Sequence, residues 1–469
     1  MMVPISTQRI MWGVGLGVAA LALSMTPRAI SVVAPVLLIV SLVAWHLSGN
    51  TNLRPRRDPR RASERMLGYT PAQLALALLA VFALWAICSA SWSPVWQQSI
   101  LKGGYLALLT ALLWGALIWP PVPAQGLREY LALVFVAAMC SIAVLLAIEV
   151  VTDQGITRWL LTELKFLRPN DPKHIHVQDG VVIGRTEAEL NRRMALLTLC
   201  LCPVAFAAAF WIRSSSERAA GQEGFGHSEG RPRQPLPFYL LLVVGAGSAA
   251  AAIFASGHQS SQTALIAAIV AYLLARYWPR LAIASVGLAW TTVVALIVPL
   301  AIAAFDYDLH RAPWLFHSAR HRVVIWHETA HRVSATMFVG VGADATPTIS
   351  RALTSSTRHD KAGEFPISLG RHAHNVYLQV WYELGTVGAA LMLSIGLLML
   401  QTIWRFGDGE ARSLALAHFA AISTMLASSY GLWQAWFQAS VALSVYFVMV
   451  LIINFGSQPP RQAQAAQRE

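Results

Sequence analysis

Apolar runs of close to 20 residues recur along most of this 469-residue chain. About 20 apolar residues are needed to cross the hydrocarbon core of a bilayer, and helices satisfy their own backbone hydrogen bonds there. The sequence therefore predicts an all-α, polytopic membrane protein with about 12 transmembrane helices. The expected spans are 10–25, 29–47, 73–93, 100–119, 127–151, 194–212, 238–257, 262–278, 281–305, 376–404, 413–436 and 437–455.

Composition excludes a water-soluble chain, because 56% of the residues are hydrophobic, 12% are charged and the mean hydropathy is +0.52. The first run follows Arg9 but lacks a small-residue cleavage site, and a second run follows at once. We therefore expect an uncleaved anchor rather than a signal peptide. All the cysteines fall within apolar runs, which indicates neither a disulfide framework nor a cysteine metal site. They are Cys88, Cys140, Cys200 and Cys202.

Short basic loops predict the orientation, because Lys and Arg near span ends stay on the cytoplasmic side. The run RPRRDPRR at 54–61 assigns that side to the loop between the second and third spans. Both termini are then cytoplasmic, and two long segments, 152–193 and 306–375, are external. The expected organisation is nine helices within 1–305, an external loop at 306–375, three helices within 376–455 and a cytoplasmic tail at 456–469.

The two external segments are rich in arginine, whose planar guanidinium matches phosphate oxygens in bidentate geometry. A solvated surface is the simpler interpretation of any single residue, but together they suggest an anionic lipid headgroup as partner. The basic residues of the first segment are Arg158, Lys165, Arg168, Lys173, Arg185, Arg192 and Arg193. Those of the second are Arg311, Arg320, Arg322, Arg332, Arg351, Arg358, Lys361 and Arg371.

The second segment contains HETAH at 327–331, a spacing that can place two zinc ligands and a general base on one helix face. A membrane zinc protease is therefore one hypothesis. The competing interpretation is an amphipathic helix over 320–338 lying along the external membrane surface, with Glu328 in an i,i+4 ion pair with Arg332. A second pattern, Asp306-Tyr-Asp308, could serve as a D-x-D metal site or be only interfacial.

The stretch RHAHNVYLQVWYELGTVGAA at 371–390 carries a distinctive spacing: His374-Asn375, nine residues, then Gly385-x-x-Gly388. On a continuous helix these positions share one stripe, where the glycines would let a neighbouring helix approach. His374 would then occupy the first exposed turn. A helix N-terminus and Arg371 both disfavour imidazolium, so His374 is suited to act as a general base. The alternative is an interfacial histidine bonded to water.

This spacing resembles the signature of the O-antigen ligase family, bacterial inner-membrane glycosyltransferases of the O-antigen ligase/polymerase superfamily. Arg322-Val-Val-Ile-Trp326 and FVGVGAD at 338–344 look like the family's R-x-x-x-W segment and its glycine turn. The resemblance implies a GT-C-like fold with a large periplasmic loop containing the amphipathic helix. It also implies transfer of a polysaccharide from undecaprenyl pyrophosphate to the lipid A-core oligosaccharide on the periplasmic face, with His374 as base and Arg322 binding pyrophosphate.

Such a donor already carries a good leaving group, so arginines and one base suffice for an inverting displacement without metal or cofactor. The expected partners are the lipid-linked donor, the lipid A-core acceptor and membrane lipids, with no nucleic acid. The family often shows a Ser-Arg pair where this chain has Gln262, so a second cation must come from elsewhere. The expected substrate-binding residues are Arg192, Arg193, Asn375, Arg371 and Gln262.

Several alternatives stay open. An O-antigen polymerase shares the donor and topology, and a protein O-oligosaccharyltransferase would use Ser or Thr acceptors. From other classes, a zinc protease requires Glu328 to act as base, and a transporter requires charges at the membrane midplane. The charges in this sequence gather at span ends instead.

Overall fold

The computed structural model describes residues 27–47, 70–118, 125–168, 174–222, 236–353 and 369–456. The expected span 10–25, the basic run 54–61 and residues 457–469 of the expected tail lie outside this part. Within it, eight helices are long and apolar enough to cross a membrane, which confirms an all-α polytopic membrane protein. These candidate spans are Pro71–Ser91, Trp96–Ile118, Leu127–Val151, Glu187–Ser216, Leu236–Ala255, Pro279–Asp306, Val376–Trp404 and Ala435–Ile452.

The chain divides into two compact units. Among the described residues, the first contains 27–33, 125–168, 174–222, 236–266 and 444–456, and the second contains 34–47, 70–118, 267–353 and 369–443. Three helices have residues in both units, namely α2 (Ile30–Leu47), α9 (Gln259–Tyr277) and α15 (Ala435–Gly456). A short 3-10 helix, η1 (Pro27–Ala29), precedes α2.

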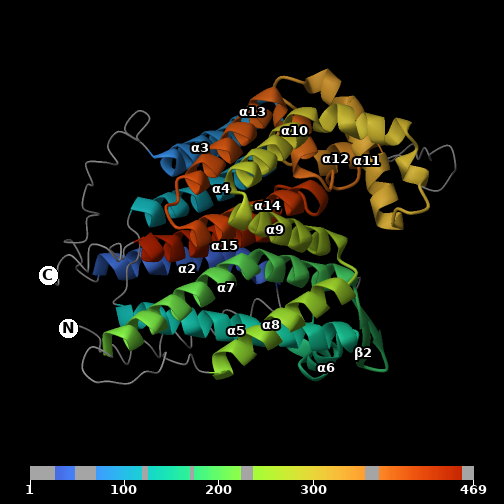
Figure 1. Cartoon of the computed structure of the whole chain (residues 1–469). Coiled ribbons are helices and arrows are strands. Elements are labelled where there is room, and N and C mark those ends of the chain that lie inside the picture. The colour runs from blue at the N-terminus through green and yellow to red at the C-terminus, as the bar shows by residue number, and fades with distance from the viewer. Residues whose placement is uncertain are drawn as a thin grey trace. The chain divides into compact units, whose positions relative to one another are not determined.

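In the first unit, α5 (Gln125–Val151) packs against α7 (Glu187–Gln222) and α8 (Leu236–Ala255). Gly245 permits the close approach of α8 to α5, because a Cβ there would lie 2.3 Å from the Cys140 sulfur. The buried core of these helices includes Ala143, Met194, Leu197 and Ile253. Figure 1 shows the three helices in green and cyan.

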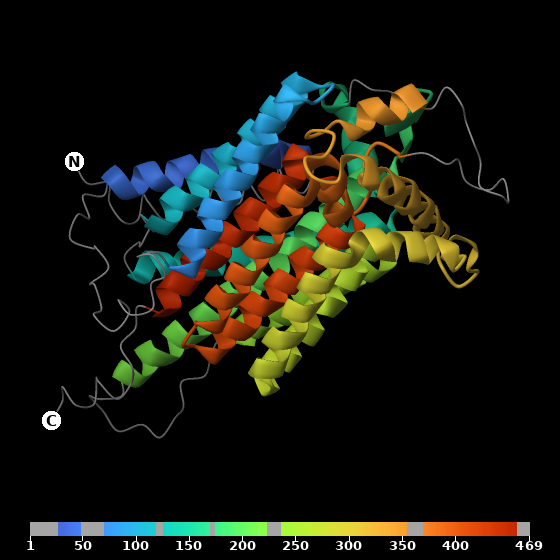
Figure 2. The ribbon, with the colours of Figure 1, turned by 90° about the horizontal axis from the view of Figure 1, so that it is seen from above.

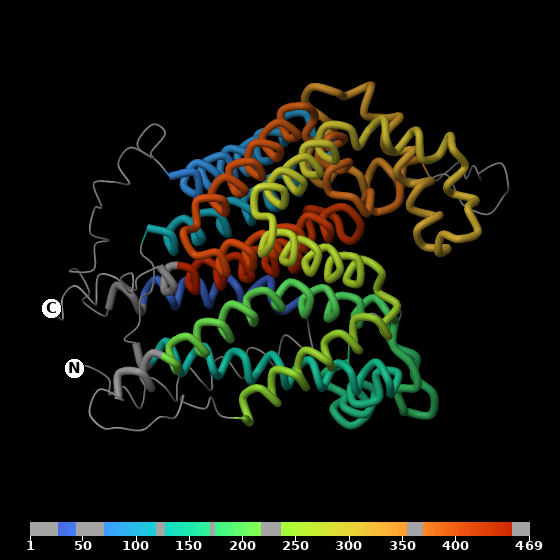
Figure 3. Tube along the Cα trace, in the orientation of Figure 1, coloured from blue at the N-terminus to red at the C-terminus, as the bar shows by residue number. Residues whose placement is uncertain are grey.

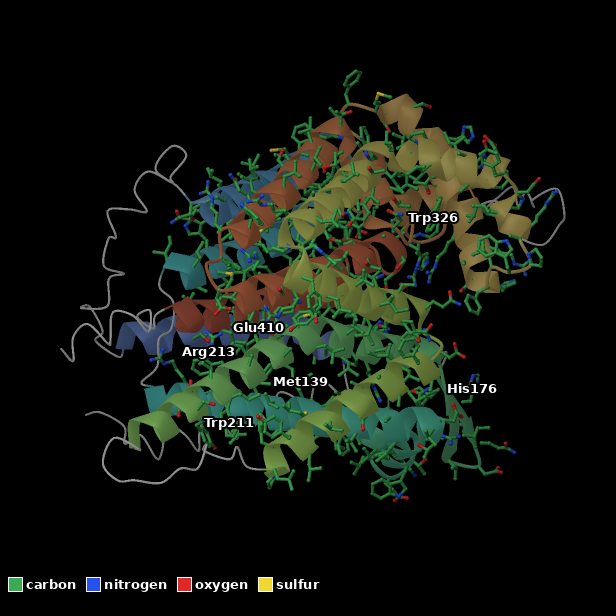
Figure 4. All side chains as sticks on the ribbon, in the orientation of Figure 1. Met139, His176, Trp211, Arg213, Trp326 and Glu410 are labelled. Carbon is green, nitrogen blue, oxygen red and sulfur yellow. The ribbon has the colours of Figure 1, made fainter. Side chains whose placement is uncertain are left out.

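A small substructure follows α5. It consists of α6 (Gly155–Glu163), η4 (Lys165–Leu167) and a hairpin of β1 (Ile175–Gln178) and β2 (Val181–Arg185). Asp179 and Gly180 both have positive φ, as a two-residue Asp-Gly hairpin turn requires. The hairpin carries the labelled His176 in Figure 4.

In the second unit, α13 (Val376–Trp404) packs against α3 (Pro71–Cys88), α10 (Pro279–Asp306) and α14 (Gly409–Ser428). A 3-10 turn, η3 (Ser89–Ser91), joins α3 to α4 (Trp96–Ile118), and these two helices pack together. Figures 1 and 2 show α10 and α13 lying side by side. Gly396 of α13 leaves room for the Trp290 indole of α10, since a Cβ there would lie 2.1 Å from its ring. The helices around α13 thus form a close-packed scaffold.

The described part of 306–375 contains four helical segments joined by turns. They are η7 (Leu309–Arg311), α11 (His317–Val333), η8 (Ser334–Thr336) and α12 (Thr346–Leu353), and Figure 3 traces the path from α10 into α11 in yellow. The amphipathic helix exists but ends at Val333, so the expected range 320–338 was too long. Its apolar face packs on α10 and α13, with Val324, Ala330 and Val333 each about 1% exposed. The expected position along the lipid surface is therefore wrong for this face.

Helix α13 is interrupted at Gly385, which has φ +66° and ψ −163°. The freed carbonyls find other donors: Tyr382 accepts from the Val341 amide at 3.0 Å and Glu383 from the Gly342 amide at 2.9 Å. A Cβ on Gly385 would lie 2.3 Å from the Phe338 carbonyl oxygen. The expected continuous stripe was thus wrong, because this glycine admits the backbone of the 337–342 turn rather than a neighbouring helix.

Candidate functional site

His374 lies just before α13 rather than in its first turn, which corrects the expected placement. The helix begins at Val376, with Asn375 as its N-cap. His374 itself has φ +52°, a left-handed conformation that persists only where the surroundings hold it. The imidazole is partly buried, and its ring lies 4.2 Å from that of His372.

The side chain of Asn375 stabilises the start of α13. Its Oδ1 accepts a hydrogen bond from the Leu378 amide at 3.1 Å, and the residue is 3% exposed. This is an N-cap interaction, which satisfies an otherwise unpaired helix donor. The structure thus gives Asn375 a helix-capping role next to His374, while substrate contact remains a prediction.

One hydrogen bond determines the tautomer of His374. Its Nδ1 lies 3.0 Å from the carbonyl oxygen of Ser429, and a carbonyl can only accept. The proton of the neutral ring therefore resides on Nδ1, which leaves Nε2 with a lone pair. This is the form of imidazole that can take a proton from a hydroxyl.

Arg322 of α11 is held at the same place. Its guanidinium donates a hydrogen bond to the Ser428 carbonyl at 2.6 Å. Ser428 directly precedes Ser429, whose carbonyl contacts His374. A guanidinium has five N–H donors, so this single bond leaves further donors for a ligand. Two consecutive carbonyls at the end of α14 thus bring together the predicted base and the predicted phosphate-binding arginine.

The charges around His374 favour its neutral form. Burial lowers its pKa below the ordinary value of 6.5, and the cation of Arg322 lowers the pKa further, against the opposing effect of the Ser429 carbonyl. Burial, with Arg371 and Arg322 nearby, lowers the pKa of His372 to about 3. Arg371 itself is exposed. The site therefore combines uncharged imidazoles with guanidinium groups, an environment that attracts anions.

The turn that carries these carbonyls was missed by the sequence interpretation, which placed a continuous span at 413–436. In the structure α14 ends at Ser428 and α15 begins at Ala435. The Ser-Ser-Tyr-Gly stretch at 428–431 is a recognisable turn signal that could have found it. We call residues 428–434 the α14–α15 turn.

The other predicted substrate-binding residues belong to the first unit. Arg193 is 2% exposed, donates to the Thr157 hydroxyl at 3.0 Å and lies 4.0 Å from the Glu149 carboxylate. Arg192 pairs with Glu189. Both guanidinium groups thus have carboxylate partners within their own unit.

Further polar groups of the first unit have structural roles as well. The Gln262 amide donates to the carbonyls of Ile253 and Phe254 at 3.3 and 3.0 Å, which satisfies the end of α8. Arg168 donates to the carbonyl of Gly180 at 2.7 Å and so ties the hairpin to its neighbours. For Gln262, substrate binding remains a prediction.

The HETAH motif has a structural explanation on α11. Arg332 contacts the Glu328 carboxylate at 2.7 Å, which confirms the expected i,i+4 ion pair. The Nε2 atoms of His327 and His331 lie 3.0 Å apart, and the His327 ring stacks on Phe305 of α10. In the D-x-D pattern, Asp308 lies 3.6 Å from Arg311. Among the described residues, no three His, Cys, Asp or Glu side chains are grouped to hold a metal ion.

Part of the chain is similar to known proteins. Residues 240–393, which include Arg322 and His374, match the family model described as O-antigen ligase. A Rickettsia bellii protein named "Putative polysaccharide ligase" is 32% identical over 137 residues, which cover 29% of this chain and 33% of that protein. A protein of the same name from Rickettsia felis is 29% identical over 137 residues, with the same coverage. The match thus spans about a third of the length of these curated relatives.

Proposed function

We propose that this chain, whose residues 240–393 match the O-antigen ligase family model, is a glycosyltransferase of the bacterial inner membrane. Its donor would be a polysaccharide on undecaprenyl pyrophosphate, and its acceptor a sugar hydroxyl of the lipid A-core oligosaccharide. The reaction would take place on the periplasmic face. Support comes from the juxtaposition of an Nδ1-protonated His374 and Arg322 at the end of α14.

The proposed chemistry is a single displacement. Nε2 of His374 takes the proton of the acceptor hydroxyl, and the oxygen forms a bond to the anomeric carbon of the donor. The bond between that carbon and the pyrophosphate oxygen breaks, and its electron pair leaves with undecaprenyl pyrophosphate. Arg322 stabilises the negative charge that develops on this leaving group. Attack opposite the leaving group inverts the anomeric configuration.

The proposed displacement needs no metal ion. A diphosphate on the anomeric carbon is an activated leaving group, and guanidinium groups can neutralise its charge with oriented hydrogen bonds. Arg371, exposed beside His372, is a second candidate for contact with the donor. Arg192 and Arg193 remain weaker candidates because their guanidinium groups already pair with carboxylates.

The test is transfer of a lipid-linked glycan to lipid A-core by the purified protein in liposomes. We expect His374→Gln to lose most of kcat, since glutamine keeps a similar size but offers no basic nitrogen. Arg322→Met should lose donor affinity and turnover together. Transfer that survives in both variants would refute the proposal, as would exclusive transfer to another lipid-linked glycan or to a protein. A chelator should leave the wild-type rate unchanged.

A further inference from the structure

A fully buried carboxylate lies at the break in α13. Glu383 is 0% exposed and accepts hydrogen bonds from the amides of Asp344 at 3.1 Å and Thr346 at 3.3 Å. It also accepts from the Thr346 hydroxyl and the Trp433 indole. Backbone amides and indoles only donate, so these contacts fit an acceptor-only carboxylate. An acidic side chain within an apolar span is costly unless it is satisfied in this way.

The partners of Glu383 come from two separate segments. Asp344 and Thr346 follow the glycine turn that docks on the break, whereas Trp433 lies in the α14–α15 turn. Gln379, one helical turn before Glu383, donates to its carboxylate at 3.2 Å and accepts from the Leu432 amide at 2.9 Å. The carboxylate therefore joins the external segment to the α14–α15 turn.

Lys102 of α4 reinforces the same connection. Its ammonium donates to the Trp433 carbonyl at 3.2 Å and lies 3.7 Å from the Asp344 carboxylate. Three side chains thus hold residues 432 and 433 of the α14–α15 turn: Glu383, Gln379 and Lys102. The opposite end of that turn presents the two carbonyls that fix Arg322 and His374.

We propose that Glu383 is a positioning residue for the transfer reaction, because it anchors the α14–α15 turn on which His374 and Arg322 are aligned. This inference rests on the proposed function. Glu383 touches neither substrate in the scheme above and acts only through the turn. Loss of the anchor should misplace Nε2 while leaving the chemistry of the imidazole intact.

Trp433→Phe is the most selective test, since it keeps an aromatic ring and removes only the indole donor to Glu383. Trp85→Phe is its matched control. Trp85 donates to the Leu384 carbonyl at 3.0 Å, at the same break in α13, but it comes from α3, and its single N–H donates to this carbonyl rather than to the α14–α15 turn. A general loosening of the break should affect both variants alike, whereas an effect through the turn should appear in Trp433→Phe alone.

In the liposome transfer assay we expect Trp433→Phe to lower kcat about 10- to 100-fold, as a misplaced base does. Its KM for the donor should stay within about twofold, since Arg322 lies on α11, which packs on α10 and α13, and keeps its other N–H donors when the Ser428 carbonyl moves. Trp85→Phe should keep the kcat of the parent. Equal kcat values for Trp433→Phe and the parent would overturn the proposal, and so would equal losses in the two variants.

The dependence of kcat on pH gives a second readout, through the limb on which kcat falls as the pH is lowered. Arg322 and His321 of α11, His372 of the same loop and the Ser429 carbonyl face His374. Burial lowers the pKa of this imidazole and the Ser429 carbonyl raises it, so a loosened turn that admits water and moves this carbonyl should change that pKa. The limb should therefore shift along the pH axis in Trp433→Phe and stay in place in Trp85→Phe. An unmoved limb in Trp433→Phe would count against the proposal.

Two further variants keep the inference testable and separate from the proposed function. If Trp433→Phe does not accumulate as folded protein, Gln379→Met removes the acceptor of the Leu432 amide and should reproduce the loss of kcat and the shifted limb. His374→Gln serves as the reference. Full transfer by His374→Gln would defeat the proposed function, whereas an inactive His374→Gln beside fully active anchor variants would defeat only the role of Glu383.

Discussion

Replacing Gly385 with alanine should destabilise the second unit and disrupt the site. A non-glycine residue held at φ +66° and ψ −163° costs about 1–3 kcal/mol. The added Cβ would also lie 2.3 Å from the Phe338 oxygen and 2.6 Å from the Val339 nitrogen, both of them backbone atoms that cannot rotate away. The 337–342 turn must therefore retreat.

That retreat strains three backbone hydrogen bonds between the turn and the break. They join Val341 to Tyr382, Gly342 to Glu383 and Thr386 to Met337, at 2.7–3.0 Å. Each contributes about 0.5–1.5 kcal/mol. With one or two of them lost, we expect a total destabilisation of roughly 2–5 kcal/mol, together with a clear loss of transfer activity.

Thermal unfolding of the detergent-solubilised protein measures the first effect, and transfer in liposomes measures the second. Gly104→Ala in α4 is the matched control, because a Cβ at Gly104 meets no atom within 4 Å. Alanine is favoured over glycine inside a helix by about 0.5–1 kcal/mol, so this control should be as stable as the parent or slightly more so. Equal unfolding midpoints for Gly385→Ala and the parent would refute the claim that the break in α13 requires glycine at position 385.

Three further predictions concern titration, the HETAH motif and a buried ion pair. Because the pKa of His374 lies below 6.5, kcat should hold at neutral pH and fall only as acid protonates Nε2; a limb above pH 6.5 would contradict this. Glu328→Gln should keep full transfer activity and lose at most about 1 kcal/mol in thermal unfolding, whereas a zinc protease would lose its activity. Arg193→Met should destabilise the fold by about 3–5 kcal/mol in the same unfolding assay, because Glu149 stays buried without its partner; a raised donor KM with unchanged stability would instead support substrate binding.

Local patterns in the sequence predicted much of the helical structure. Apolar runs located the helices because burial in lipid demands them, and the Glu328–Arg332 pair followed from helical spacing alone. The spacing around His374 and the R-x-x-x-W segment also directed attention to two residues that the structure brings to adjacent carbonyls.

The rest of the site depends on contacts distant in sequence. A helical stripe assumes an unbroken helix, and whether Gly385 continues or interrupts it depends on the backbone of residues 337–342. Ser428 and Ser429 contact Arg322 and His374 through backbone carbonyls, which every residue has, so no side-chain pattern predicts these contacts. Glu383 did carry a signal, since an ionisable residue within an apolar run indicates a functional or organising role. Apart from Gln379, however, its partners are 37 to 50 positions away.

The most direct measurement is a structure of the protein in a lipid nanodisc with undecaprenyl pyrophosphate bound. The account predicts diphosphate oxygens within hydrogen-bonding distance of the Arg322 guanidinium, with Nε2 of His374 open toward the acceptor side. A diphosphate held away from Arg322, or an Nε2 that donates a hydrogen bond to the protein itself, would contradict it.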